Sequence, residues 1–203
     1  MYIGSGDTTA LLSGLNTETH RKLLRRFVSD EIPIYNAKSS PINALRTGAI
    51  LEERFLLHLG DKYLPQYKVT DSVHDCCKAT LDFAEVQSNC VVNFIELKTA
   101  WLTDYQQINL YRDKSKEEQI AFLKKNYKHN YEQVQFQLMC SGLDKGHLCY
   151  LEVQSYNDEE NYQRVIQPDE YVIFDIERDE VVIQTIKLRV ILFQYIKDTY
   201  VTY

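Results

Sequence analysis

Glu96 and Lys98 are the polar residues whose spacing most suggests chemistry, because a single residue separates them in Ile95-Glu96-Leu97-Lys98. Residues 91–99 are rich in β-branched and apolar side chains, which is typical of a strand. Successive side chains of a strand point to opposite faces, so Glu96 and Lys98 would share one face while Ile95 and Leu97 enter the opposite layer. Taken by itself, such a pair is most simply a surface ion pair of small energetic weight.

Two further carboxylates could join this face. Asp82 lies in the preceding predicted strand, residues 79–86, across a short connection from Glu96, and Glu52 lies in the middle of a predicted helix. Carboxylate oxygens suit Mg²⁺ or Mn²⁺, which bridges a phosphate and lowers the pKa of a bound water. A lysine can position that water or stabilise developing charge. Each carboxylate alone would more simply be a solvated surface group.

Hydrophobic periodicity and turn residues predict the elements that would position these groups. Helices are predicted over residues 17–27, 43–59 and 131–141, the last two ending before Gly60 and Gly142. An antiparallel meander is predicted from strands 67–73, 79–86 and 91–99, followed later by strands 147–154 and 171–176. Residues 38–41 are predicted to form a turn, and residues 112–128 a helix or mobile insertion. The tail, residues 180–203, stays open between strand and helix.

The composition indicates one ordered domain, residues 1–203, because 44% hydrophobic residues can build one sizeable core and exclude wholesale disorder. The formal net charge of -6 disfavours diffuse attachment to nucleic acid or anionic membrane, but leaves room for a local basic surface. The first residues lack a secretory signal, and no apolar run approaches the length of a membrane span. We therefore expect a soluble protein of the cytoplasm, with no membrane partner.

Other familiar kinds of catalytic or cofactor site find no support. The five cysteines include the adjacent pair Cys76-Cys77, which lacks the gap of a zinc or iron-sulfur knuckle, so we expect reduced thiols. The five histidines have neither metal-ligand spacing nor a nucleophile partner motif. No glycine-rich phosphate loop is present in the sequence, so ATP is not expected as a cofactor.

Four short motifs occur in an order typical of one enzyme group. They are Gly48-Ala49-Ile50-Leu51-Glu52, Asp82, Glu96-Leu97-Lys98 and Gln133-Val134-Gln135. Each motif is weak alone, but four in sequence are more specific. Together they resemble the PD-(D/E)XK nuclease superfamily, most closely its lambda exonuclease or YqaJ-like viral recombinase branch.

The resemblance implies an α/β (α+β) fold with a restriction-endonuclease-like core of αβββαβ order and a mixed central sheet flanked by helices. This agrees with the element order predicted above. The catalytic core would occupy about residues 43–155, with an N-terminal helical segment and a C-terminal extension.

The resemblance also implies roles for individual residues. Asp82 and Glu96 would ligate the metal together with the backbone carbonyl of Leu97, and Lys98 would orient or activate the attacking water. Glu52 would complete the site through a second metal or a water. The residues around Asp82, Thr80-Leu81-Asp82-Phe83, depart from the family pattern of Pro or Ser-Pro before this Asp and Gly after it. Asp71 and Asp75 are therefore alternative positions for this ligand.

Glutamines of the predicted helix 131–141 would hold the active-site arrangement or the DNA end. The resemblance favours Gln135 first and Gln133 second. Gln133 and Gln137 are four residues apart and share a helix face, whereas Gln135 points elsewhere. Spacing alone does not decide which glutamine is functional.

Basic side chains in two segments are candidates for contact with the DNA backbone. Arg21 and Arg25 are four residues apart on the first predicted helix, a geometry that could grip successive phosphates. Lys124 and Lys125 precede the glutamine helix in a basic and aromatic stretch. In both segments a solvated charged surface is at least an equally good interpretation.

The function expected from the resemblance is a Mg²⁺-dependent (or Mn²⁺-dependent) DNA exonuclease of phage-type recombination, located in the host cytoplasm if phage-encoded. A single-strand annealing protein would be its partner, and a ring-shaped homotrimer its assembly. No iron-sulfur cluster is expected, since the five cysteines do not fit the spacing of the branch that carries one. The alternatives are a structure-specific or restriction-like endonuclease on the same fold, and a catalytically silent DNA-binding or scaffold protein.

Overall fold

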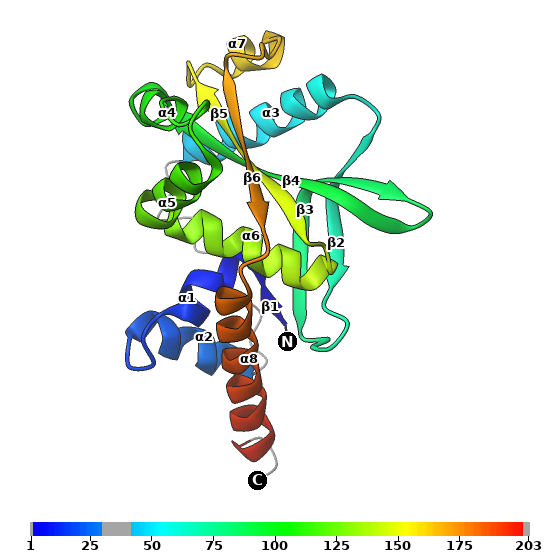
Figure 1. Cartoon of the computed structure of the whole chain (residues 1–203), viewed down its shortest axis with the longest axis vertical. Coiled ribbons are helices and arrows are strands. Elements are labelled where there is room, and N and C mark those ends of the chain that lie inside the picture. Colours follow the sequence, from blue (N-terminus) through cyan, green and yellow to red (C-terminus); the bar gives the residue numbers. More distant parts are fainter. Residues whose placement is uncertain (1, 30–41, 201–203) are drawn as a thin grey trace.

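A computed structural model describes residues 2–29 and 42–200 of the chain (Figure 1). An N-terminal part contains β1 (Ile3–Gly4), the short 3-10 helix η1 (Ser5–Asp7), α1 (Thr8–Leu12) and α2 (Glu18–Ser29). There follow α3 (Ile42–Leu59), β2 (Tyr63–Thr70), β3 (Cys77–Gln87), β4 (Cys90–Trp101), α4 (Leu102–Asn109), α5 (Lys116–Asn126), α6 (Lys128–Ser141), β5 (Lys145–Val153), α7 (Asp158–Gln163), β6 (Tyr171–Glu177) and α8 (Glu180–Tyr200). The turn predicted at residues 38–41 lies outside the described residues.

The strands form one mixed sheet in the order β1-β3-β4-β5-β6, with β2 paired to β3 away from this path. The pairs β2–β3, β3–β4 and β5–β6 are antiparallel, whereas β1–β3 and β4–β5 are parallel. A parallel pair needs a crossover connection, and α4, α5 and α6 supply it between β4 and β5. The expected mixed sheet and the αβββαβ order, here α3-β2-β3-β4-α6-β5, are confirmed.

Helices cover both faces of the sheet, and the side chains of β4 alternate between them. Ile95 and Leu97 pack in a cluster with Leu51 and Phe55 of α3. Phe94 and Ala100 pack in another cluster, with side chains of α4, α5 and α6. Glu96 and Lys98 alternate in step with Phe94 and Ala100 along β4, so all four side chains point to the same face of the sheet. Helix α6 covers this face (Figure 1).

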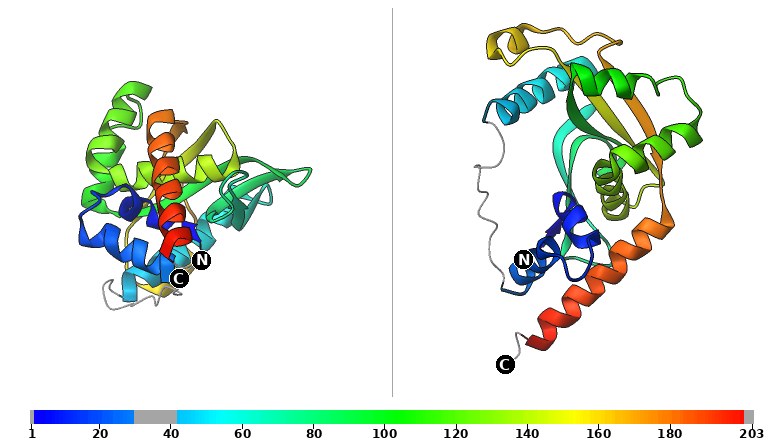
Figure 2. Two further views of the ribbon diagram at one scale, coloured as in Figure 1. Left: turned by 90° about the horizontal axis from the view of Figure 1, so that it is seen from below. Right: turned by 90° about the vertical axis from the view of Figure 1, so that its left-hand side faces the viewer.

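A third cluster joins the two ends of the chain. Apolar residues of α1 and α2 meet α6 and α8 there, and they include Leu11, Phe27, Phe136, Ile186 and Phe193. Helix α8 runs obliquely away from the sheet past the N-terminal helices (Figure 2). Helix α6 therefore packs against the sheet on one side and against the two terminal segments on the other.

The structure moves several predicted boundaries and resolves the open ones. Strand β2 runs from Tyr63 to Thr70 rather than over residues 67–73. The described part of the tail, Glu180–Tyr200, is helical, and its buried apolar residues recur at helical spacing, at Ile183, Ile186, Val190 and Phe193. Within residues 112–128 a helix begins at Lys116, where the Ser115 side chain accepts a hydrogen bond from the Glu118 N–H. The helices α4 and α7 have no counterpart among the predicted elements.

Among the described residues, no helix is long and apolar enough to cross a membrane. The longest one, α8, carries charged residues along its length and buries one face against α1, α2 and α6.

The burial of His20 predicts that the free energy of unfolding depends on pH. Its ring is 2% exposed and stands edge-on to Phe193, with ring centroids 5.0 Å apart. Burial, aided by the charge of Arg189, lowers the pKa of His20 below its ordinary value of 6.5. The folded protein thus binds fewer protons at His20 than the unfolded chain does. The stability that the neutral His20 ring contributes is therefore fully present above pH 6.5 and is lost as the pH falls through the folded pKa.

We expect the free energy of unfolding to fall less between pH 7 and pH 5 in His20→Leu than in the native protein. Urea unfolding at several pH values measures it, with the exposed His58→Gln as the control. Equal pH profiles for native protein and His20→Leu would contradict the interpretation.

Candidate active site

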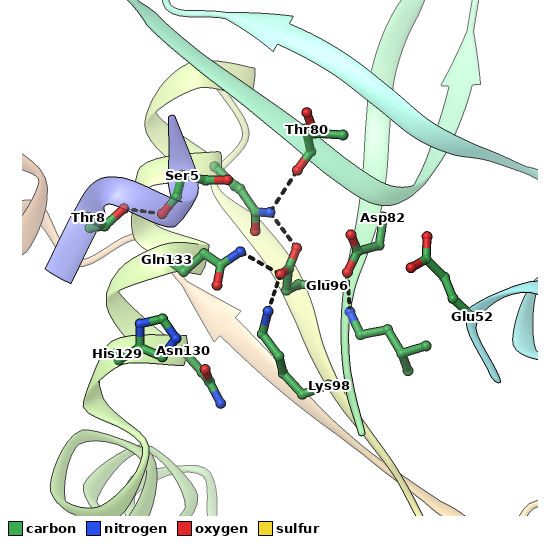
Figure 3. A network of polar contacts seen from close by, with 12 residues as sticks. Ser5, Thr8, Glu52, Thr80, Asp82, Glu96, Lys98, His129, Asn130 and Gln133 are labelled. Atoms are coloured by element: carbon green, nitrogen blue, oxygen red, sulfur yellow. Dashed lines mark hydrogen bonds and ion pairs between the residues drawn. The ribbon is translucent and has the colours of Figure 1, made fainter. Parts of the chain in front are cut away.

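The candidate site lies in a fork where β3 and β4 part. The two strands are paired from Gln87↔Cys90 as far as Phe83↔Ile95. Just beyond this point the Asp82 side chain takes the place of a backbone partner, because its Oδ2 accepts a hydrogen bond from the Leu97 N–H at 2.9 Å. A partly buried N–H must be satisfied, and Asp82 does so where the strands part, which also places it beside Glu96 (Figure 3).

Glu96 is the most buried group of the site, only 1% exposed. Its Oε1 accepts hydrogen bonds from Lys98 Nζ and Gln133 Nε2, both at 2.6 Å. Its Oε2 accepts one from Gln137 Nε2 at 2.5 Å, and the same amide also donates to the Thr80 carbonyl at 3.0 Å. Burying a carboxylate is costly unless it is paired and hydrogen-bonded, and these three donors meet that requirement.

Lys98 links the buried carboxylate to solvent. Its ammonium bonds to Glu96, while its side chain keeps 27% exposure. It is thus a partly accessible positive charge at the mouth of the fork. We call Glu52, Asp82, Glu96 and Lys98 the fork site.

Asp82 and Glu52 carry unfavourable negative charge. Burial, together with the nearby Glu96 carboxylate, raises the pKa of Asp82 to about 8, although the Leu97 N–H and Lys98 oppose the shift. Burial also raises the pKa of Glu52, and Glu96 adds to this effect. Three carboxylates face a single lysine here, so the site favours an added positive charge.

Gln66 of β2 joins Glu52 to Asp82. Its amide nitrogen donates to Glu52 Oε1, and it also donates to Asp82 Oδ1 at 3.4 Å. One oxygen of each carboxylate therefore converges on a single atom. Gln66 has a φ of +51°, a left-handed conformation that costs about 1 kcal/mol for a residue with a Cβ. A depression of about 400 Å³ lined by Glu52, Gln66 and Phe83 opens beside them.

The donor set fits a divalent cation of the magnesium type. Mg²⁺ is usually held by one or two carboxylates and completes its octahedron with water and substrate oxygens. Glu52 and Asp82 supply two hard oxygens that converge on one point, with mutual repulsion that a cation would relieve. Throughout residues 2–29 and 42–200, no group of three or more His, Cys, Asp or Glu side chains is placed to hold a metal ion.

The structure brings together Glu52, Asp82, Glu96, Lys98 and Gln133, which lie on four separate elements. It does not bring Gln135 to this cluster. The fully buried Gln135 donates to the Glu177 carbonyl at 2.8 Å and accepts from the Asp179 N–H at 2.7 Å. It therefore ties α6 to the junction of β6 and α8. Gln137, which shares the helix face of Gln133, is the second glutamine at Glu96.

The alternative aspartates lie in the turn between β2 and β3. Asp71 Oδ2 accepts from the N–H groups of Val73 and His74, at 3.2 and 2.7 Å, so its role is to stabilise the turn. Asp75 is exposed in the same turn. Asp82 is thus the aspartate beside Glu96. Leu97 reaches Asp82 through its N–H, and a ligand role for its carbonyl stays a prediction.

The basic side chains that are candidates for DNA contact lie on two separate helices. Arg21 and Arg25 are exposed on α2, and Arg25 is 3.9 Å from Glu18. On α5, Lys124 is paired with Asp179 at 2.8 Å, whereas Lys125 is exposed. Lys124 thus has a structural partner, and its contact with DNA stays a prediction, as do those of the other three.

Three side chains of the site neighbourhood have no role assigned to them from the sequence: Gln66, Gln137 and His129. His129 lies beside Lys98 in Figure 3 and its Nδ1 is 2.7 Å from Thr9 Oγ1. Burial and then the Lys98 charge lower the pKa of His129. The only signal in the sequence was the helix face that Gln137 shares with Gln133. The positive φ of Gln66 and the contact of His129 with Thr9 cannot be predicted from local sequence pattern.

Comparison with known proteins gives a likeness in structure. An alkaline exonuclease from Laribacter hongkongensis superposes with a TM-score of 0.62 at 13% identity, covering 100% of this chain and 90% of its own. A phage-related exonuclease from Haemophilus somnus 129PT gives 0.65 at 17% identity, covering 100% and 96%. The alkaline exonuclease in complex with dAMP gives 0.64 at 16% identity, covering 100% and 90%. The nuclease fold implied by the resemblance is confirmed.

No protein-family model matches the sequence. A search of curated proteins also found no match.

The raised pKa of Asp82 predicts that Asp82→Asn stabilises the metal-free protein at alkaline pH. An acid whose folded pKa lies above its unfolded value of 3.8 contributes stability at low pH, and this is lost as the pH rises through about 8. Asparagine cannot ionise and can still accept from the Leu97 N–H. We expect the gain to grow as the pH rises from about 4 toward 8, so that it is several kcal/mol larger at pH 8.5 than at pH 5.

Urea unfolding in the presence of a chelator tests this, with the exposed Asp75→Asn as the matched control. If Asp82→Asn is destabilising at both pH values, the Asp82 carboxylate is not under strain in the metal-free fold.

Proposed function

We propose that this protein is a divalent-metal-dependent deoxyribonuclease that hydrolyses DNA phosphodiester bonds and acts as a phage-type recombination exonuclease. The observation that carries the proposal is the fork site, which brings carboxylates from α3, β3 and β4 together with one lysine. The site occurs on a fold shared with two exonucleases over the whole chain. A protein that kept the fold only as a scaffold would not need this unfavourable cluster of charge.

The carboxylates have distinct roles in the proposed reaction. Asp82 and Glu52 would hold Mg²⁺ or Mn²⁺, with Glu96 and the Leu97 carbonyl as further ligands. When bound, such a cation lowers the pKa of a water and offsets the charge of the phosphate. Glu96 is oriented by Gln133 and Gln137 from α6. The chain thus presents acceptors on one side of the fork and a positive charge on the other.

Lys98 would act on the reacting groups. Its ammonium is held at Glu96 and is partly exposed, so it can donate a hydrogen bond to the attacking water or to a phosphate oxygen without leaving its partner. Fixing such a donor in advance lowers the barrier because charge developing in the transition state meets a group already in place.

DNA is the proposed substrate, and its contacts must be local because the net charge of the chain is -6. The exposed cations that could contact the phosphates of the DNA backbone are Arg21, Arg25 and Lys125. Gln133 lies at the fork site, where it donates to Glu96. An annealing protein as partner and a trimeric assembly are part of the proposal and rest on the family resemblance.

Cleavage assays with two DNA forms test the proposal. We expect native protein with Mg²⁺ to degrade end-labelled linear duplex and to leave closed circular DNA intact. Lys98→Ala removes the positioned donor and should slow degradation by roughly 100-fold or more. Lys145→Ala, an exposed lysine at the start of β5, is the matched control and should retain native activity.

Cutting of the circle would assign the protein to the endonucleases instead. Activity of Lys98→Ala equal to that of native protein would remove the fork site from the reaction. If clean, folded native protein cuts neither substrate, the scaffold interpretation holds.

Substitutions of Gln133 and Gln135 should have different effects: the first should mainly lower the cleavage rate, and the second should mainly lower the stability. Gln133→Leu removes a donor from Glu96 at the half-buried edge of the site, so we expect at least a roughly tenfold loss of cleavage rate and a small change in stability. Gln135→Leu leaves two partly buried backbone groups without this partner and should cost about 1 kcal/mol or more of stability. The folded Gln135→Leu protein should keep its cleavage rate. The reverse pattern would return the catalytic role to Gln135.

A further inference from the structure

Gln66 is held in a backbone conformation that the strand does not require. Three non-glycine residues among those described have positive φ: Gln66, Ser88 and Asn89. Ser88 and Asn89 form the tight turn between β3 and β4, where positive φ is usual. Gln66 instead lies inside β2, between the pairs Pro65↔Phe83 and Tyr67↔Leu81. This places it opposite Asp82.

The conformation serves a contact between three elements. The amide of Gln66 from β2 reaches Glu52 on α3 and Asp82 on β3. A primary amide has two N–H bonds and a partial positive charge on that side, so it can give one hydrogen bond to each carboxylate. The amide therefore lies where the two carboxylate oxygens converge, which is also the position that a shared cation would take.

We propose that Gln66 is a built-in competitor for the divalent cation, which stabilises the metal-free fork site and thereby sets the metal affinity of the protein. This inference rests on the proposed metal-dependent function. The amide and a cation need the same oxygens, Glu52 Oε1 and Asp82 Oδ1. Binding of a cation must therefore break both hydrogen bonds and turn the Gln66 side chain away.

The consequence for affinity follows from linkage. Any contact present only in the metal-free state lowers the apparent affinity for the metal by the free energy of that contact. Removal of the amide should thus tighten metal binding while it destabilises the metal-free protein. A residue that merely supported the fold would have the opposite effect on affinity, because its loss would leave the carboxylates less well placed.

Three substitutions at position 66 separate the amide from the backbone strain. Gln66→Ala removes the amide and keeps a Cβ at positive φ, whereas Gln66→Gly removes both the amide and the strain. Gln66→Glu keeps the size of the side chain and replaces the donor by a fourth carboxylate at the fork site. The matched control is Gln87→Ala, because the exposed Gln87 amide donates to Glu85 at 2.9 Å in a similar Gln–Glu contact on the same sheet.

The measurement is titration calorimetry of the full chain with Mn²⁺, after removal of metal by a chelator and dialysis. Thermal melting with and without Mn²⁺ provides a second readout that does not depend on activity. We expect Kd to fall roughly three- to tenfold in Gln66→Ala and Gln66→Gly, and further in Gln66→Glu. The melting temperature of metal-free Gln66→Glu should be the lowest, and its increase with Mn²⁺ the largest. Gln87→Ala should bind as the native protein does.

The possible results separate a failure of the competitor role of Gln66 from a failure of the proposed metal-dependent function. A Kd that is unchanged or higher in both Gln66→Ala and Gln66→Gly, with Mn²⁺ binding by the native protein intact, would overturn the competitor role and leave the metal site standing. Failure of folded native protein to bind Mn²⁺ or Mg²⁺ would overturn both. If Gln66→Ala fails to fold, Gln66→Gly gives the decision, since it is free of backbone strain.

Discussion

The burial of one carboxylate, Glu96, constrains much of the structure around it. A charged group with 1% exposure must be matched by donors, and Lys98 on the same strand supplies only one. The others come from α6, which must lie across the fork with Gln133 and Gln137 facing the sheet. The apolar packing of α6 thus holds its polar face, with Gln133 and Gln137, where the buried Glu96 carboxylate needs hydrogen-bond donors.

Helix α6 meets that requirement because it is held from both sides. Toward the sheet it packs with the large cluster that includes Phe94 and Tyr150. On its other side Phe136 and Met139 belong to the apolar cluster that α6 forms with α1, α2 and α8. Gln135 fastens the same helix to the start of α8 through backbone groups. The terminal segments therefore help to hold the glutamines against Glu96, although they lie far from the fork in the sequence.

The charge balance of the fork site also has a structural origin. Asp82 is needed at the Leu97 N–H because β3 and β4 separate there. Its position brings a second carboxylate next to Glu96 and a third, Glu52, within electrostatic reach. The Gln66 amide and Lys98 offset part of this repulsion. The cluster is costly to the metal-free protein, which is typical of sites that act on a charged ligand.

Local sequence pattern determined the features that depend on neighbours along the chain. The two-residue period of β4 placed Glu96 and Lys98 on one face, and helical and strand periods predicted the αβββαβ order with Glu52 on a helix. Only the tertiary structure shows which of Asp71, Asp75 and Asp82 lies beside Glu96, because that depends on where β3 leaves β4. It likewise assigned Gln137 rather than Gln135 to Glu96, made the tail a helix, and placed the Gln66 amide between two carboxylates. These outcomes depend on contacts between segments distant in sequence, whose cost or gain in free energy exists only once the segments are packed together.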